Sequence, residues 1–238
     1  MNNKLLKPFL IAEMSFCAFK ERSVNKCYDR FASHYDLLFG ELQSAAAEVL
    51  KSYMLESGLT ARKALDLGCG TGIMTSRLAD IADYIVGTDF SEKMLLIAKA
   101  KHNGEKYDFI QRNILYPCEI KGRFDLITAL GIIPHIPHVL AEKWFEEIKT
   151  LLEPQGHLIL GISPAPWRWF SHAKPICDFS FVDIIFVTIY NAIMKAFKIE
   201  AQCWYWKLNM LERILERQGF RVKSFIRDNI LIVDAVVQ

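Results

Sequence analysis

The pattern that most limits the fold is an alternation of short apolar runs with longer amphipathic stretches, which begins at Lys63. Continuous apolar runs suit strands that are covered on both faces, and the stretches between them suit helices. The alternation therefore predicts an α/β fold in which βα units surround a parallel sheet. The expected strands are 63–67, 84–89, 107–113, 124–131 and 157–163, and the expected helices are 72–82, 91–102 and 139–152.

Local signals place the ends of several helices. Ser91 is a good N-cap for the helix 91–102, and Pro154-Gln155-Gly156 indicates a turn after the helix 139–152. Upstream, residues 24–57 read as helices broken at Gly40. Downstream, residues 205–218 read as a helix that stops at Gly219.

The C-terminal region predicts a hairpin. Segments 221–227 and 230–237 read as strands, with only Asp228-Asn229 between them. A two-residue link permits only antiparallel neighbours. We therefore expect a seven-stranded, mostly parallel sheet with an antiparallel last strand and helices on both faces.

Three glycines follow the first expected strand, in the stretch LDLGCGTG at 65–72. Ligands of parallel sheets bind where the first βα turn meets a helix N-terminus. Gly68, Gly70 and Gly72 occupy that turn, where glycine permits positive φ and close approach of a ligand to the backbone. Asp89 ends the second expected strand, where a carboxylate can accept hydrogen bonds from both hydroxyls of a ribose. The two features predict a nucleoside-bearing ligand.

Asp66 indicates which nucleoside-bearing compound the ligand is. A dinucleotide-binding turn reads G-x-G-x-x-G and presents backbone N–H groups to a pyrophosphate. This chain reads G-x-G-x-G, with Asp66 two positions before the first glycine. A carboxylate there would repel phosphate and suits a ligand with an ammonium group. S-adenosylmethionine, a nucleoside joined to an amino acid through a sulfonium, fits, and its product would be S-adenosylhomocysteine.

The stretch ALDLGCGTG, the acidic strand end in GTDFS and the order of elements resemble the class I S-adenosylmethionine-dependent methyltransferases. The resemblance covers roughly 24–163 and the closing hairpin, and it implies a Rossmann-like fold. It divides the chain into a helical cap at 1–57, a cofactor-binding domain at 58–163 and 205–238, and an insertion at 164–204 that lies outside the resemblance. The activity that it implies is methylation of a small molecule.

The resemblance also implies a set of cofactor-binding residues. Asp66 would pair with the cofactor ammonium, the glycines would surround its methionine portion, and Asp89 would hold the ribose diol. Phe90 and Met94 would pack against the adenine, with ordinary core packing as an equal alternative. Asn113 stands where the family often has a polar side chain for the adenine amino group. The whole set is Asp66, Gly68, Cys69, Gly70, Gly72, Asp89, Phe90, Met94, Asn113, Ile114, Leu130 and Gly131.

Catalytic candidates follow the fourth expected strand, in LGIIPHIPH at 130–138. A general base helps methyl transfer only when the acceptor atom carries a proton. His135 and His138 are candidates for that role or for substrate orientation, with packing or helix capping as alternatives. Tyr35 is a third catalytic candidate. Since no third ligand accompanies the two histidines, no metal site is expected.

Aromatic side chains predict the acceptor side of the site. Tyr28 and Tyr35 are seven residues apart and so share one helix face, either lining the pocket or packing in the core, and His34 lies between them. The insertion 164–204 and the residues after it are strongly apolar, which is typical of a lid over a hydrophobic or aromatic acceptor. A dimer interface and a membrane-surface helix are alternatives. The expected acceptor-binding residues are Tyr28, His34, Trp167, Trp169, Trp204 and Trp206.

Composition narrows the class of protein further. The net charge of +2 argues against an extended nucleic-acid surface, although methylation of RNA or protein and a non-catalytic cofactor-binding role remain alternatives. The six cysteines show no CxxC pair, which is typical of reduced thiols in an intracellular protein. We expect no signal peptide, no membrane span and a cytoplasmic monomer or homodimer, with peripheral membrane contact as a possibility through the insertion.

Overall fold

The computed structural model describes residues 23–162, 192 and 206–238. Seven strands form one sheet in the order β3-β2-β1-β4-β5-β7-β6. Their bounds are β1 Ala61–Leu67, β2 Ala82–Asp89, β3 Tyr107–Gln111, β4 Phe124–Leu130, β5 Leu152–Ile162, β6 Phe220–Arg227 and β7 Ile230–Val237. Strand β7 runs antiparallel to both neighbours, β5 and β6, while the other pairs are parallel. The predicted seven-stranded sheet with an antiparallel last strand is confirmed.

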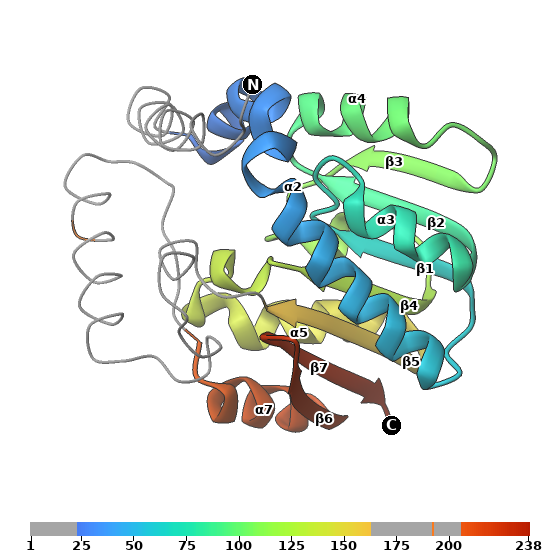
Figure 1. The fold of residues 1–238 in the computed structure, drawn as a ribbon. Helices are drawn as coiled ribbons and strands as arrows, with labels where there is room; N and C mark the ends of the chain where they lie inside the picture. The colour runs from blue at the N-terminus through green and yellow to red at the C-terminus, as the bar shows by residue number, and fades with distance from the viewer. Residues whose placement is uncertain (1–22, 163–191, 193–205) are drawn as a thin grey trace.

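Helices cover both faces of the sheet (Figure 1). On one face lie α2 (Val24–Glu56), α3 (Ile73–Arg77) and α4 (Glu92–Lys101). On the other lie α5 (His138–Leu151) and α7 (Leu208–Arg217). None of the helices in the described part of the chain is long and apolar enough to cross a membrane.

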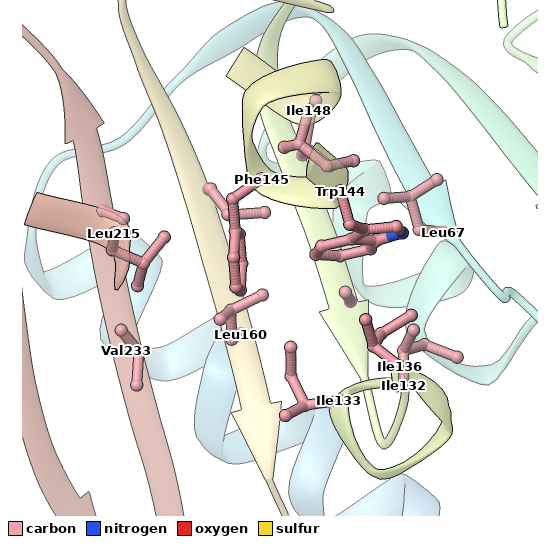
Figure 2. Close-up of a cluster of buried hydrophobic side chains, with 14 of the residues drawn as sticks. Leu67, Ile132, Ile133, Ile136, Trp144, Phe145, Ile148, Leu160, Leu215 and Val233 are labelled. Carbon is pink, nitrogen blue, oxygen red and sulfur yellow. The ribbon is translucent and has the colours of Figure 1, made fainter. Parts of the chain in front are cut away.

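The larger hydrophobic core lies between the sheet and the helices α5 and α7 (Figure 2). Helix α5 contributes Trp144, Phe145 and Ile148, which recur at helical spacing and are at most 1% exposed. The Trp144 indole N–H donates to the Ile114 carbonyl at 2.6 Å, so the buried nitrogen keeps a partner. This core holds the loop after β4 against the sheet, because Ile133 also belongs to it.

The predicted break at Gly40 is wrong, because α2 is one helix of 33 residues. An interior glycine costs a helix only about 1 kcal/mol relative to alanine. The buried residues that follow it, among them Ala47, Leu50 and Met54, pack against the sheet and outweigh that cost.

Two other predicted boundaries are wrong. The expected helix 72–82 is shorter, because α3 ends at Arg77 and a 3₁₀ turn over Leu78–Asp80 leads directly into β2. Pro154-Gln155-Gly156 does not separate α5 from a strand. These residues lie within β5, where the register against β4 jumps from Phe124–Leu152 to Leu126–His157. They therefore form a bulge, with Gln155 at φ 61°.

The hairpin and the Ser91 cap were predicted correctly. Asp228 and Asn229 have φ values of 49° and 63°, the left-handed conformation that suits a two-residue hairpin turn. The Ser91 hydroxyl accepts a hydrogen bond from the Met94 backbone N–H at 3.2 Å.

Candidate functional site

The strand order creates a crevice between β1 and β4. From this pair the chain continues to β2 and β3 on one side and to β5 on the other. Ligands of open α/β sheets bind at such a switch point, beyond the carboxyl ends of the strands. A small pocket of about 30 Å³ lies there. It is lined by Tyr35, Gln43, Asp66, Gly68, Cys69, Gly70, Thr71, Ile73, Met74 and Leu130.

The three glycines of the first turn all have positive φ, but they serve different purposes. A Cβ on Gly68 would lie 2.2 Å from Ile132 Cδ1, and one on Gly72 would lie 2.7 Å from the His102 ring. These two positions are therefore fixed by packing as well as by conformation. A Cβ on Gly70, at φ 53°, would meet nothing within 4 Å. Gly70 thus offers open backbone to a ligand.

Asp66 lies beneath this turn and is only 1% exposed. Its Oδ2 accepts from the Thr75 hydroxyl at 2.6 Å and its Oδ1 from the Thr128 hydroxyl at 3.1 Å. Thr128 is its direct neighbour across the β1–β4 pair. Burial raises the pKa of Asp66 to about 7, although both threonine hydrogen bonds act in the opposite direction. An ammonium group nearby would favour the ionised carboxylate.

Asp89 lies beside the same turn and is 6% exposed. Its Oδ2 accepts from the Gly70 N–H at 3.0 Å and its Oδ1 from the Ser91 N–H at 2.9 Å. Burial raises the pKa of Asp89 to about 6 against the effect of these backbone hydrogen bonds. Each carboxylate oxygen has a further lone pair, so the group retains acceptor capacity for a diol.

Four of the predicted aromatic residues meet at the same edge of the sheet. The Tyr28 ring centroid lies 5.5 Å from that of Phe90, 6.2 Å from Tyr35 and 6.5 Å from His135. His135 ends a 3₁₀ turn over Ile133–His135, and burial lowers the pKa of its imidazole. Burial also raises the pKa of the Tyr35 hydroxyl, as do the carboxylates of Asp89 and Asp36.

The other expected cofactor residues surround the two turns. Met94 is 1% exposed and lies in the first turn of α4. The Asn113 side-chain oxygen accepts from the Leu115 N–H at 3.0 Å. Ile114 approaches Gly68, since its Cγ2 would lie 3.6 Å from a Cβ there. Gly131 follows β4 at φ 73°.

Some expected catalytic and acceptor residues have neighbours away from this pocket. The His138 ring stacks edge-on against Trp206, with centroids 4.7 Å apart. Trp206 is 5% exposed and its indole N–H donates to the Ile136 carbonyl at 3.3 Å. His34 packs beside Phe31, at a centroid separation of 6.1 Å. Trp167, Trp169, Trp204 and the insertion 164–204 lie outside the described residues.

Sequence reasoning missed several polar residues of the site. The Asp36 carboxylate accepts from the Thr71 hydroxyl at 2.6 Å, and Gln43 lines the pocket. Thr75 and Thr128 hold Asp66. Asp36 had a readable signal, because Tyr-Asp occurs twice in YDRFASHYD. The threonines had none, since their role depends on which strands become neighbours.

Comparison with known proteins identifies the domain. Residues 64–156 match a family model described as a methyltransferase domain. A Geobacillus protein named as a methyltransferase, with no acceptor stated, is 32% identical over 68% of this chain and 64% of its own. The ubiquinone biosynthesis O-methyltransferase of Vibrio parahaemolyticus is 31% identical over 45% of this chain and 47% of its own. The chain therefore spans less than two thirds of the length of these relatives.

The fold is also found among solved structures. The magnesium protoporphyrin IX methyltransferase of Synechocystis, solved with bound S-adenosylhomocysteine, superposes with a TM-score of 0.56. The two chains are 20% identical, and the match covers 82% of this chain and 83% of that one. At this identity the likeness concerns the fold, and it confirms the expected Rossmann-like architecture.

Proposed function

Since the chain belongs to the class I S-adenosylmethionine-dependent methyltransferase family, we propose that it methylates a small, hydrophobic or aromatic acceptor by in-line displacement. The observation that carries the proposal is the open backbone at Gly70, which lies between two buried carboxylates. A neutral turn of this shape would suit many ligands. Two carboxylates beside it favour a ligand that is cationic at one end and carries a diol at the other.

We assign the described residues to the cofactor group by group. Asp66 would face its ammonium, directly or through water, and Asp89 its ribose hydroxyls. Phe90 and Met94 would contact the adenine, and Asn113 its amino group. The remaining turn residues, Cys69, Ile114, Leu130 and Gly131, would surround the methionine portion and the ring edges.

When bound, S-adenosylmethionine supplies a methyl group on a sulfonium whose sulfur is a built-in leaving group. The task of the protein is to hold the acceptor in line with that methyl group and to exclude water. We assign orientation of the acceptor to Tyr28 and Tyr35, whose rings lie beside the cofactor turns.

We assign the general base to His135. Its imidazole contacts the Tyr28 ring at the edge of the site, and burial lowers its pKa, so it is neutral at physiological pH. A neutral imidazole can take the proton that the acceptor atom loses as its bond to the methyl carbon forms. Tyr35, with its raised pKa, stays protonated and therefore does not serve as the general base. His138 packs on Trp206 and is the weaker candidate.

The acceptor side would be completed by residues 164–204, which we propose as a lid. The start of α5 presents Val139, 87% exposed, and Leu140 at this end of the molecule. Two of the similar proteins are named for ubiquinone biosynthesis and for magnesium protoporphyrin IX, and neither name points to a macromolecular acceptor. We therefore favour a small-molecule acceptor over RNA or protein, in a cytoplasmic enzyme.

Calorimetry with S-adenosylhomocysteine tests the cofactor site. Asp89→Ala removes both the diol acceptor and the hydrogen bonds to Gly70 and Ser91, and we expect at least about 100-fold weaker binding. Asp83→Ala, at the exposed start of the same strand, is the matched control and should bind normally. Failure of the folded wild-type protein to bind would overturn the proposal.

The pH dependence of turnover tests His135. With any acceptor found by screening, wild-type kcat should fall in acid, at a lower pH than an ordinary histidine would give, because burial lowers the pKa of His135. His135→Gln should lower kcat by about 100-fold or more and remove this acid limb, with cofactor affinity unchanged. A merely structural role for His135 would lower activity equally at every pH.

A further inference from the structure

The glycine-rich turn is held from outside the pocket by the C-terminal end of α4, where two consecutive side chains contact two consecutive carbonyls. Lys101, the last residue of α4, donates to the Thr71 carbonyl at 3.1 Å. His102 caps the helix, and its Nε2 lies 3.0 Å from the Gly72 carbonyl oxygen. None of the described residues that line the pocket comes from α4 or its cap. The two carbonyls are therefore held toward α4.

The contact with Gly72 determines which nitrogen of His102 carries a proton. A carbonyl oxygen can only accept, so Nε2 is the protonated nitrogen and donates. Burial lowers the pKa of His102, while the hydrogen bond to Gly72 raises it and the Lys101 ammonium lowers it further. The ring is therefore neutral at physiological pH, and it keeps the same Nε2–H donor if it becomes charged.

The His102 ring also occupies the space beside Gly72. A Cβ on Gly72 would lie 2.7 Å from His102 Cδ2 and 2.8 Å from its Nε2. Gly72 adopts φ 86° and is the N-cap of α3, and its carbonyl also accepts from the Ser76 N–H at 3.1 Å. The carbonyl that begins α3 is thus fixed by a helix N–H on one side and by His102 on the other.

The His102 ring belongs to a group of three aromatic rings between α4 and β3. Its centroid lies 5.3 Å from that of Tyr107 and 6.2 Å from that of Phe109, at an interplanar angle of 25° to Phe109. Tyr107 and Phe109 are nearly parallel, with an angle of 12°. Phe109 is 6% exposed and shares a small hydrophobic cluster with Cys69 of the glycine-rich turn. The three rings therefore support the turn at both of its ends, Cys69 and Gly72.

A second glycine makes room for the same rings. Gly87 lies opposite Phe109 in the β2–β3 pair. A Cβ on Gly87 would lie 2.8 Å from the Phe109 ring and 3.1 Å from Cys69 Sγ. The φ of Gly87 is not positive, so its backbone conformation does not require glycine. Packing explains the missing side chain at Gly87, and glycines of two separate segments thus accommodate one group of rings behind the turn.

We propose that His102 is a positioning residue for the cofactor, which fixes Gly72 and through it the backbone of the turn that lines the pocket. The turn is closed by a hydrogen bond of 2.9 Å from the Gly72 N–H to the Cys69 carbonyl, so a displacement of Gly72 also displaces Gly70 and Thr71 between them. A turn that is already in place binds its ligand without the free-energy cost of ordering it. The inference rests on the proposed function, because it takes the adenosyl compound as the ligand.

Two substitutions of His102 separate its hydrogen bond from its bulk, with the dissociation constant of S-adenosylhomocysteine measured by calorimetry. His102→Leu keeps an apolar side chain over Gly72 but removes the donor, and it should weaken binding by about three- to tenfold. His102→Gln offers an amide N–H in the place of the Nε2–H and should restore most of the affinity. Wild-type affinity in His102→Leu, or equal losses in the two variants, would overturn the role of the hydrogen bond.

Lys106→Met is the matched control for a general loss of stability. Lys106 Nζ also donates to a backbone carbonyl, that of Ala79 at 2.6 Å, in the 3₁₀ turn that follows α3 at the end away from the pocket. Its removal should lower the melting temperature as His102→Leu does and leave the dissociation constant unchanged. If affinity falls in proportion to melting temperature in both variants, His102 acts on stability alone and the inference is wrong.

Hydrogen exchange of the ligand-free protein distinguishes this inference from the proposed function. The Gly72 and Ser76 amides should exchange faster in His102→Leu than in wild type, and His102→Gln should restore their protection. Unchanged protection in His102→Leu contradicts the inference even if the wild-type protein binds S-adenosylhomocysteine. Absence of binding by the wild-type protein contradicts the proposed function, while faster exchange in His102→Leu would still show that His102 orders the turn.

Discussion

The two halves of α2 are continuous in backbone and differ in what holds them. The half after Gly40 is fixed by buried contacts: Leu50 fills the space above Gly161 of β5, and the Tyr53 hydroxyl donates to Asp234 at 2.6 Å. The half before Gly40 faces the cofactor turns through Asp29 and Asp36. One helix therefore combines a structural segment with a segment placed for ligand contact.

This difference in contacts predicts that the half before Gly40 is the less stable part of the helix. Elements that move on ligand binding come from the least stable parts of a protein. The two halves differ in their contacts, and the following experiments test whether they also differ in their contributions to stability and ligand binding.

The largest contrast should appear in the core. Leu50 has no exposure and Leu38 only 2%, but Leu50 belongs to the core shared with the sheet and Leu38 to a small cluster with Phe31. Leu50→Ala should lower the free energy of unfolding by about 2–5 kcal/mol in guanidinium titrations. Leu38→Ala should cost clearly less, because the cluster around Leu38 is much smaller than the core around Leu50. Equal losses would show that the two halves unfold together.

A smaller contrast should appear between two tyrosines of α2. Tyr53→Phe removes the donor to Asp234, which is 6% exposed, and should cost about 1–3 kcal/mol of stability. Asp234 keeps its contact with His157 Nδ1 at 2.8 Å, which limits the loss. For Tyr35 the described part of the structure records no hydrogen bond of the hydroxyl, so Tyr35→Phe should leave the denaturation midpoint almost unchanged. A large loss in Tyr35→Phe would assign a structural role to the half before Gly40.

The smallest effect concerns pH. Because the pKa of Asp66 is raised to about 7, its contribution to stability is present below pH 4 and is lost as pH rises through 7. A bound ammonium favours the carboxylate, so binding below pH 7 should release a proton. The affinity for S-adenosylhomocysteine should then rise by up to about tenfold per pH unit and level off above pH 7.

Calorimetry in buffers of different ionisation enthalpy measures that proton release. Asp66→Asn should abolish most of it and leave a weaker dependence centred near pH 6, from Asp89. If the variant kept the full pH dependence, Asp66 would not face the cofactor cation.

The sequence predicted the strands well because a short continuous apolar run is stable in a strand whose two faces are both covered. It placed Gly70 and Asp89 at the carboxyl ends of neighbouring strands, because Gly70 follows β1 and Asp89 ends β2, so that their neighbours in the chain fix their positions. It failed at Gly40, since local helix propensity is weaker than the packing of residues ten positions later.

Contacts across distant segments could not be read in advance. Thr128 reaches Asp66 only because β4 lies beside β1, and Asp36 reaches Thr71 only because α2 packs beside the turn that leads into α3. The sequence also did not show that the three glycines of the turn serve different purposes. Gly68 leaves room for the Ile132 side chain, whose position depends on the packing of the loop after β4.

The antiparallel hairpin has a consequence for how the chain assembles. Strand β6 pairs only with β7, and β7 alone joins it to β5. Strand β6 therefore cannot join the sheet before β7 does, and the tight bend at Asp228-Asn229 sets the alignment of the two strands. Alterations of that bend should change the speed of folding more than the final architecture.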